Sequence, residues 1–249
     1  MAFRIGRRGV FLALLAGTCL ALPACTTNVA TTGPGAPLAG GPRPRRILVE
    51  NFPVDWSGER LDTSIGATLR RSASGEDPQQ EAVTIAREVQ EAIAETLARR
   101  ISATGLPVFR VAPGSPATPG DVILQGRITT INQGNRTRRT LIGFGAGQSV
   151  VQADAELLRA GRGGAPRLLQ SYVASSDSGR RPGLGIGAAA GAASGHIATA
   201  AGLGAADTAA GAHRSEVAQE ATRLANHLAD DITQLFATEG WIAPAAAPP

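Results

Sequence analysis

The sequence predicts an α+β domain in which two amphipathic helices cover one face of a largely antiparallel sheet. The prediction depends on two patterns. Apolar residues recur every three or four positions near 78–101 and 215–235, which is typical of helices with one buried face. Short runs rich in β-branched and apolar residues precede or separate these segments and are typical of strands. The predicted order is β-α-β-β-β-β-α, with a glycine- and alanine-rich insertion before the last helix.

The first strand is predicted at residues 46–52, stopped by Pro53, and a polar loop follows it. The first long helix should begin at Asp77 and Pro78, because aspartate is a good N-cap and proline suits the first helical turn. Gly105 is predicted to end it. The apolar face of this helix consists of Ala82, Ile85, Val89, Ile93, Leu97 and Ile101.

Four further strands are predicted at residues 106–111, 122–131, 149–158 and 168–175. In the third of these, apolar and polar residues alternate, which indicates a strand with one face in solvent. A glycine-rich turn at 161–164 should join the last two strands as a hairpin. The final helix is expected from about Ser215, with a face formed by Val217, Ala221, Leu224, Leu228, Ile232 and Leu235.

The first 24 residues resemble a lipoprotein signal peptide, since three arginines precede a short apolar run. Leu22-Pro23-Ala24-Cys25 resembles the lipobox of bacterial lipoproteins, with Leu22 and Ala24 before an acylated Cys25. The resemblance implies cleavage before Cys25 and several acyl chains, because a single chain binds membranes only marginally. Thr26 in place of aspartate favours the outer membrane. A plain secretory signal with a chance cysteine is the alternative.

Charge and cysteine content narrow the function classes. The formal net charge is +4, and the signal carries three arginines, so the chain from Cys25 onward is close to neutral. This balance removes the case for a nucleic-acid partner. Cys19 would leave with the signal and Cys25 would be acylated, so no disulfide is expected.

The remaining chain divides into three parts. Residues 25–45 are rich in proline, glycine and threonine, so they are expected to be a flexible spacer between anchor and domain. Residues 46–240 are expected to form a single periplasmic domain that contains the glycine- and alanine-rich segment at 183–211. Residues 241–249 are expected to be a disordered tail.

The central stretch ILQGRITTINQGNRTRRTLIGFGAGQSVVQADAELL resembles an uncharacterised family of bacterial lipoproteins, known only as a domain of unknown function of the 4410 type. The resemblance covers about residues 46–238 and implies a fold and a compartment, but no reaction. By topology the chain is also similar to periplasmic domains of secretion and envelope-assembly lipoproteins, several of which form rings. The family motif is carried mainly by Gly126, Arg139, Gly143, Phe144, Gly145 and Gly147.

Arg136, Arg138 and Arg139 form a dense basic cluster that is a candidate contact for anionic lipid or glycan. The alternative is a solvated hairpin end. The neighbouring glycines do not form a nucleotide-binding fingerprint, because its third glycine would fall at Gln148. Neither the spacing of the three histidines nor any nucleophile motif indicates a metal, a cofactor or a catalytic residue.

Residues 184–206 form a run of 23 residues without a charged side chain. Gly187, Gly191 and Gly195 recur every four positions, so a helix formed here would expose bare backbone on one face for close helix packing. Few large apolar residues are present, which disfavours a lone membrane-spanning helix. A loop or small helical hairpin packed on the domain, an oligomeric interface and a membrane-inserting hairpin remain open.

These observations predict a non-enzymatic lipoprotein at the periplasmic face of the outer membrane, acting as an accessory or assembly module of the cell envelope. Its expected partners are the membrane, through acyl chains on Cys25, and an envelope protein or further copies of itself. One alternative is a self-assembling ring or pore subunit that uses the glycine- and alanine-rich segment. The other is an enzyme with an unrecognised site.

Overall fold

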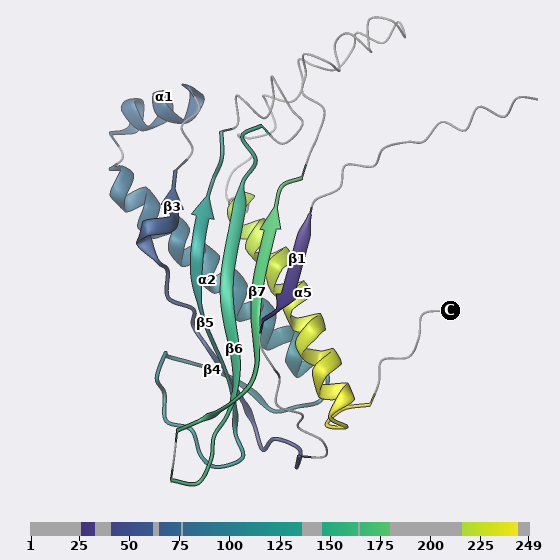
Figure 1. Cartoon of the computed structure of the whole chain (residues 1–249). Coiled ribbons are helices and arrows are strands. Elements are labelled where there is room, and N and C mark those ends of the chain that lie inside the picture. The colour runs from purple at the N-terminus through teal and green to yellow at the C-terminus, as the bar shows by residue number, and fades with distance from the viewer. Residues whose placement is uncertain are drawn as a thin grey trace, which may run out of the picture.

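The computed structural model describes residues 26–32, 41–61, 65–75, 77–135, 146–163, 165–179 and 216–243. Figure 1 shows one sheet with two long helices, α2 (Pro78–Ser102) and α5 (Glu216–Thr238), lying across the same face. The strand order is β1-β7-β6-β5-β2-β4, with β3 beside β5. The predicted α+β class, with a largely antiparallel sheet and two helices on one face, is confirmed.

The five predicted strands are present as β2 (Ile47–Glu50), β4 (Val108–Val111), β5 (Val122–Asn132), β6 (Val150–Arg159) and β7 (Arg167–Asp177). Strands β5, β6 and β7 pair antiparallel, and β6 and β7 form the predicted hairpin. β2 instead runs parallel to both of its neighbours. Parallel neighbours need a long crossover, which α2 provides between β2 and β4.

Helix α2 begins as predicted. The Asp77 carboxylate accepts a hydrogen bond from the backbone N–H of Gln79 at 3.0 Å, and Pro78 occupies the first turn. Just beyond its C-terminus, Gly105 has a φ of 80°, a conformation that favours glycine.

The core lies between the sheet and the two helices. All seven of the large apolar residues along the middle of the two predicted faces are at most 6% exposed, namely Ile85, Val89, Ile93, Leu97, Leu224, Leu228 and Ile232. In β6 the predicted alternation also holds, because Val151, Ala153, Ala155 and Leu157 are buried in this core. Their burial supplies the main stabilising term of the fold.

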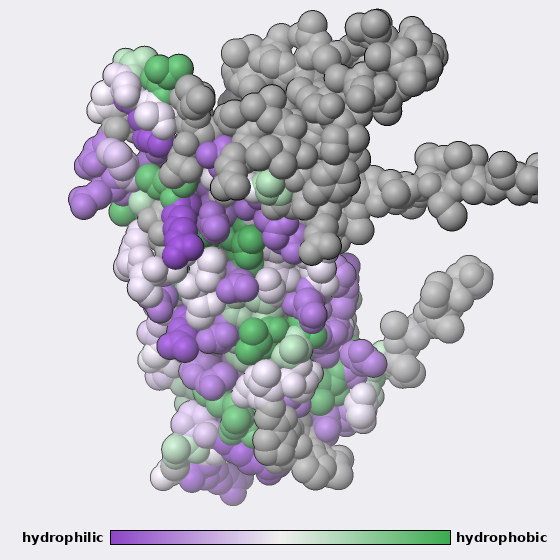
Figure 2. Space-filling view, turned by 45° about the horizontal axis from the view of Figure 1, so that its top comes forward, coloured by the Kyte–Doolittle hydropathy of each residue, from purple (hydrophilic) through white to green (hydrophobic). Residues whose placement is uncertain are grey.

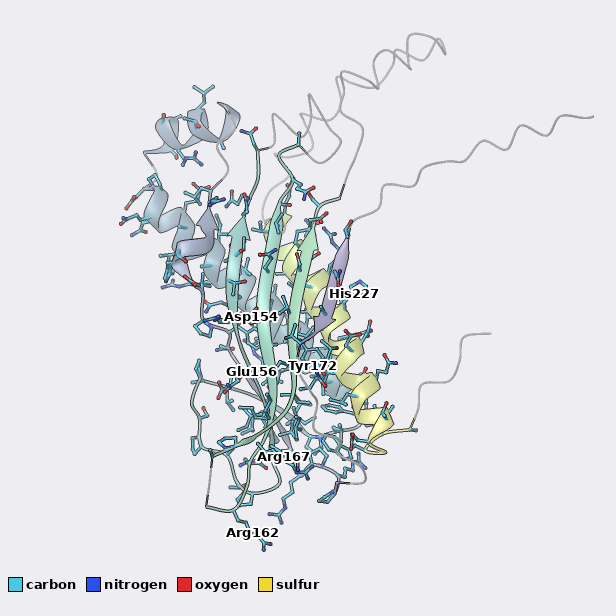
Figure 3. All side chains as sticks on the ribbon, in the orientation of Figure 1. Asp154, Glu156, Arg162, Arg167, Tyr172 and His227 are labelled. Carbon is cyan, nitrogen blue, oxygen red and sulfur yellow. The ribbon has the colours of Figure 1, made fainter. Side chains whose placement is uncertain are left out.

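The opposite face of the sheet is not covered by any helix of the described residues, and we call it the open face (Figure 1). In Figure 2 this face shows hydrophobic side chains scattered between hydrophilic ones. Asp154 and Glu156 of β6 lie on it (Figure 3). A strand with one solvated face produces this alternation of polar and apolar side chains.

The expected spacer at 25–45 contains a strand. β1 (Thr27–Thr31) pairs antiparallel with β7 along its whole length and forms one edge of the sheet. Val29 packs against the core, and β7 would otherwise be an unpaired edge. The prediction of a fully flexible spacer is therefore wrong for residues 27–31.

The disordered tail was expected to begin at residue 241, but Trp241 is part of the folded domain. Trp241 is only 3% exposed, its ring lies 5.2 Å from that of Phe236, and its indole N–H donates to the Gly41 carbonyl at 3.0 Å. The segment between β2 and α2, predicted as a polar loop, also contains structure: the short helix η1 (Trp56–Gly58), β3 (Glu59–Arg60) and α1 (Ile65–Ser74).

Gly126 lies in β5, and the ring of the core residue Phe52 packs against it. A Cβ atom on Gly126 would be 2.5 Å from the Phe52 ring and 2.4 Å from the Asp154 carbonyl oxygen. Both distances are far below van der Waals contact, and Phe52 is fully buried. The glycine of the family motif is therefore required by close packing against Phe52.

We expect Gly126→Ala to lower the free energy of unfolding by about 1–3 kcal/mol, because the added methyl group overpacks a filled core. Urea denaturation would measure this change. Gly161→Ala is the matched control, since nothing lies within 4 Å of a Cβ atom there. Equal stability of the two variants would contradict the packing role of Gly126.

Candidate functional site

The site residues expected from the sequence lie outside the described residues. This applies to the lipobox residues Leu22, Ala24 and Cys25, the arginines Arg136, Arg138 and Arg139, and the glycines Gly187, Gly191 and Gly195. The described residues that flank each group are informative nonetheless, because they show where each segment leaves the domain.

All three groups join the domain at one end of the sheet. The Asp177 N–H donates to the Thr26 carbonyl at 3.0 Å, so the residue after Cys25 lies beside the last residue of β7. Strand pairing places Asn132 and Val150 next to Asp177. We call this region, defined by Thr26, Asn132, Val150 and Asp177, the upper end, as it is in Figure 1. The chain leaves the described part near this end before the arginine cluster and again before the glycine- and alanine-rich segment.

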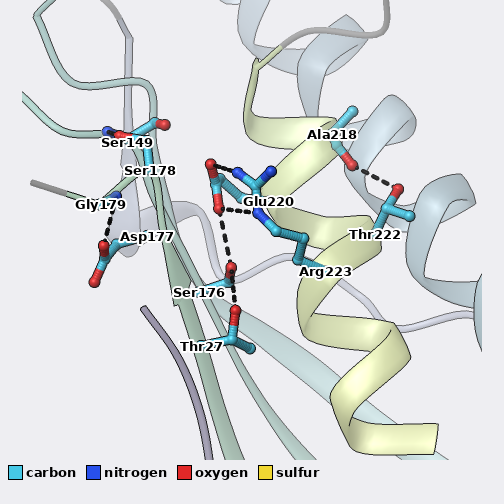
Figure 4. A network of polar contacts seen from close by, with 10 residues as sticks. All are labelled: Thr27, Ser149, Ser176, Asp177, Ser178, Gly179, Ala218, Glu220, Thr222 and Arg223. Carbon is cyan, nitrogen blue, oxygen red and sulfur yellow. Dashed lines mark hydrogen bonds and ion pairs between the residues drawn. The ribbon is translucent and has the colours of Figure 1, made fainter. Parts of the chain in front are cut away.

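The start of β1 is tied to β7 and α5 by a buried polar network (Figure 4). The Ser176 hydroxyl donates to the Glu220 carboxylate at 2.9 Å and lies 3.2 Å from the Thr27 hydroxyl. The Arg223 guanidinium donates to the same carboxylate through Nε at 3.0 Å and also through Nη2. Glu220 is 1% exposed, so its charge is stabilised by Arg223 and Ser176 rather than by water.

The network leaves a short connection to Cys25. Thr27 is fixed, and Cys25 precedes it by two residues. Two extended residues span about 7 Å. Any group attached to Cys25 is therefore held close to the upper end, and the long spacer expected from composition does not separate the two.

The two residues that flank the segment with the arginine cluster are joined by a backbone hydrogen bond. The Asn135 N–H donates to the Gly147 carbonyl at 3.0 Å. Gly134 and Gly147 have φ values of 73° and 75°, and a Cβ atom on Gly134 would lie 2.3 Å from the Gly147 carbonyl oxygen. Glycine is needed at Gly134 for both the conformation and the close approach.

The open face bears a hollow of about 460 Å³ with an acidic lining. Arg127 donates to the Asp154 carboxylate at 3.2 Å, and Gln125 donates to Glu156 at 3.0 Å. The Gly114 N–H donates to the Glu50 carboxylate at 3.0 Å. The described lining, which contains no histidine, consists of Glu50, Pro53, Pro113, Gln125, Gly126, Arg127, Asp154 and Glu156.

An apolar row also crosses the open face. Strand pairing aligns Phe109, Leu48, Ile123, Leu158 and Leu168 across five strands, and none of them belongs to the core under the helices. Only the two ends of the row are exposed, Phe109 at 53% and Leu168 at 40%, whereas Leu48 and Ile123 between them are buried. Phe109 and Leu168 are therefore the apolar side chains of this row that a protein partner could contact.

A second hollow, of about 840 Å³, lies beside the C-terminal half of α5. It is lined mainly by threonine and alanine side chains, together with Asp230, which pairs with Arg100 of α2. In the described ranges, no three histidine, cysteine, aspartate or glutamate side chains are grouped as a metal site requires. None of the described helices combines the length and apolarity of a membrane-spanning segment.

The sequence carries one local signal of the network. Glu220 lies three residues after Val217 and four before Leu224, so it occupies the predicted apolar face of the last helix. A carboxylate on such a face needs a buried partner. Ser176 could not be identified as that partner, since the pairing of β7 with α5 depends on the tertiary fold.

We expect Glu220→Ala to lower the free energy of unfolding by about 1–3 kcal/mol, because it leaves the buried Ser176 hydroxyl without its carboxylate acceptor. Hydrogen exchange of the β1 amides should accelerate as well. Asp230→Ala on the same helix is the control and should cost about 1 kcal/mol or less, since its ion pair with Arg100 is exposed. Unchanged exchange in β1 would show that the network does not hold this strand.

No curated protein matches the chain. Among solved structures, it is similar to the PelC dodecamer from Paraburkholderia phytofirmans, with 16% identity over 82% of this chain and 94% of that chain, and a TM-score of 0.36. A point variant of that dodecamer gives 16% identity, coverage of 82% and 98%, and a TM-score of 0.34. Likenesses of this degree do not extend to function.

The profile of the family described as "Domain of unknown function (DUF4410)" matches residues 47–195, more than half of the chain. The matched range contains Gly126, Gly134 and Gly147, whose close backbone contacts the structure explains. The chain belongs to the DUF4410 family, as its central motif predicted.

Proposed function

We propose that this protein is a lipoprotein anchored to the outer membrane through Cys25, and that it serves in the periplasm as a non-enzymatic accessory or assembly module of the cell envelope. The observation that carries the proposal is the position of β1. This strand begins two residues after Cys25 and is joined to β7 and α5 by the Thr27–Ser176–Glu220–Arg223 network.

The short connection gives the domain an orientation. Acyl chains on Cys25 would hold the upper end within about 7 Å of the membrane surface. Asn135 and Gly147, which flank the arginine-bearing segment, belong to the same end. The segment between Asn135 and Gly147 carries arginines and begins and ends at the upper end. Such arginines are suited to lipid phosphate groups, which guanidinium binds in a bidentate manner.

A binding role is supported by the open face. Its apolar row offers Phe109 and Leu168 to a protein partner, and its hollow supplies carboxylate and amide groups that are already hydrogen-bonded. These features support a binding role of the kind that an accessory module has.

The anchor is tested by Cys25→Ser. We expect the variant to accumulate as an uncleaved precursor and to be lost from the outer-membrane fraction, because the thioether and the new amine cannot form. Cys19→Ser is the matched control and should remain anchored, since Cys19 lies in the signal. Metabolic labelling with palmitate, followed by fractionation, measures both. Retention of the Cys25→Ser protein in the outer-membrane fraction after a carbonate wash would refute the proposal.

Self-assembly is the second candidate, favoured by the exposed Phe109 and Leu168 at the two ends of the apolar row. The glycine- and alanine-rich segment provides its test through Gly191→Ile, with Ala193→Ile as a control off the Gly187-Gly191-Gly195 face. We expect oligomer size in mild detergent to be unchanged and stability to shift by about 0.5 kcal/mol or less, as for a solvated position. A smaller oligomer for Gly191→Ile alone would make self-assembly the better proposal.

A further inference from the structure

Five arginines gather at the end of the sheet opposite to the upper end. Figure 3 shows Arg162 and Arg167 there, in the β6–β7 turn and at the start of β7. Arg159 ends β6 and is paired with Arg167 across the strands. Arg45 joins them through backbone hydrogen bonds, from its N–H to Gly120 at 3.3 Å and from Gly120 to Ala160 at 3.1 Å. We call this region the lower end, and its five arginines are Arg43, Arg45, Arg159, Arg162 and Arg167.

The positive charge of the lower end is not neutralised within the described residues. Asp121, which the fold places there, is fully buried and engaged by Arg46 at 2.9 Å and by Thr118. Burial raises the pKa of Asp121, but the hydrogen bonds from Arg46 and Thr118 outweigh it and hold the pKa below its usual value. The carboxylate is therefore ionised and occupied by Arg46. None of the five arginines forms an ion pair with a described carboxylate.

The arrangement of Arg159 has an electrostatic cost. Like charges directly opposite each other on neighbouring strands are destabilising, and Arg159 faces Arg167 in this way. Burial and then the charge of Arg167 lower the pKa of Arg159. Its guanidinium is nevertheless held in place, because Nη2 donates to the Pro42 carbonyl at 2.6 Å and the group lies 5.3 Å from the Trp241 ring centroid.

Neutral partners thus position Arg159 without cancelling its charge. Arg43 is held in the same manner, through a hydrogen bond to the Gly105 carbonyl at 3.1 Å. Arg43, Arg45, Arg162 and Arg167 are all exposed. They come from two separate stretches of chain along the sheet end, which suits an anion with several charged groups in a row. A cluster of cations whose charge no described carboxylate cancels favours an anionic ligand.

We infer that the lower end is a binding surface for an anionic polysaccharide that carries carboxylate groups along its chain. Guanidinium binds carboxylate with two parallel hydrogen bonds, and a repeating acidic glycan offers one such group after another. The choice of glycan rests on the proposed function. β6 has ten residues and spans about 30 Å, so a domain that stands upright on an anchor at the upper end places the arginines beyond the headgroups of its own membrane.

The test measures binding of a fluorescent oligogalacturonate to the full-length chain in mild detergent. We expect saturable binding that weakens as salt rises, and no binding of the fully methyl-esterified oligomer. The triple variant Arg45→Gln, Arg162→Gln, Arg167→Gln should weaken binding by about tenfold or more. The control triple variant Arg60→Gln, Arg87→Gln, Arg127→Gln removes the same charge away from the lower end and should change the affinity by about twofold or less.

Three results would overturn the inference. They are absence of binding, an equal loss in both triple variants, and tighter binding of anionic vesicles or duplex DNA than of the glycan at equal charge. If the triple variant fails to fold, Arg162→Gln in the exposed turn replaces it and must still weaken binding. The assay does not depend on acylation. A chain that binds the glycan but fractionates without the membrane would refute the anchor and leave the binding surface established.

Discussion

The pairing of β1 with β7 is the constraint on which the arrangement of this molecule depends. It converts residues beside Cys25 from a free chain into part of the sheet. Its register is specific, because a shift by one residue would turn Val29 from the core toward solvent. The Ser176–Glu220–Arg223 network also stabilises this end of the sheet. A buried carboxylate is tolerable only where such partners are in place.

The elements predicted correctly are those with a strong local signal. Helices α2 and α5 are long enough for their apolar periodicity to be unambiguous, and β6 alternates from Val151 to Leu157. β1 was not predicted, because its five residues lie next to a long proline- and glycine-rich stretch that dominates the local composition. Its pairing depends on the free edge of β7, which is not visible locally. α1 contains Gly66 and two serines, residues that are weak helix formers.

The same limit applies to the surfaces. In the sequence, the densest basic cluster is Arg136 to Arg139, which therefore drew the functional prediction. In the structure, a larger group of arginines forms from residues more than a hundred positions apart, such as Arg45 and Arg167. Sheet pairing brings them together, so no window along the chain could reveal them. The acidic hollow is similar, since Glu50 and Glu156 come from distant strands.

The short connection at Cys25 bears on how far the basic lower end lies from the proposed anchor. Anionic membrane surfaces attract clustered arginines, so a domain with a basic lower end would tend to lie down on such a surface. A free spacer of some twenty residues would permit this, because its average end-to-end distance of about 25 Å is close to the length of the sheet. With β1 docked, about two residues remain between the proposed anchor and the rigid sheet. If Cys25 is acylated as proposed, the strands β5, β6 and β7 separate the basic lower end from the anchor by the length of the sheet.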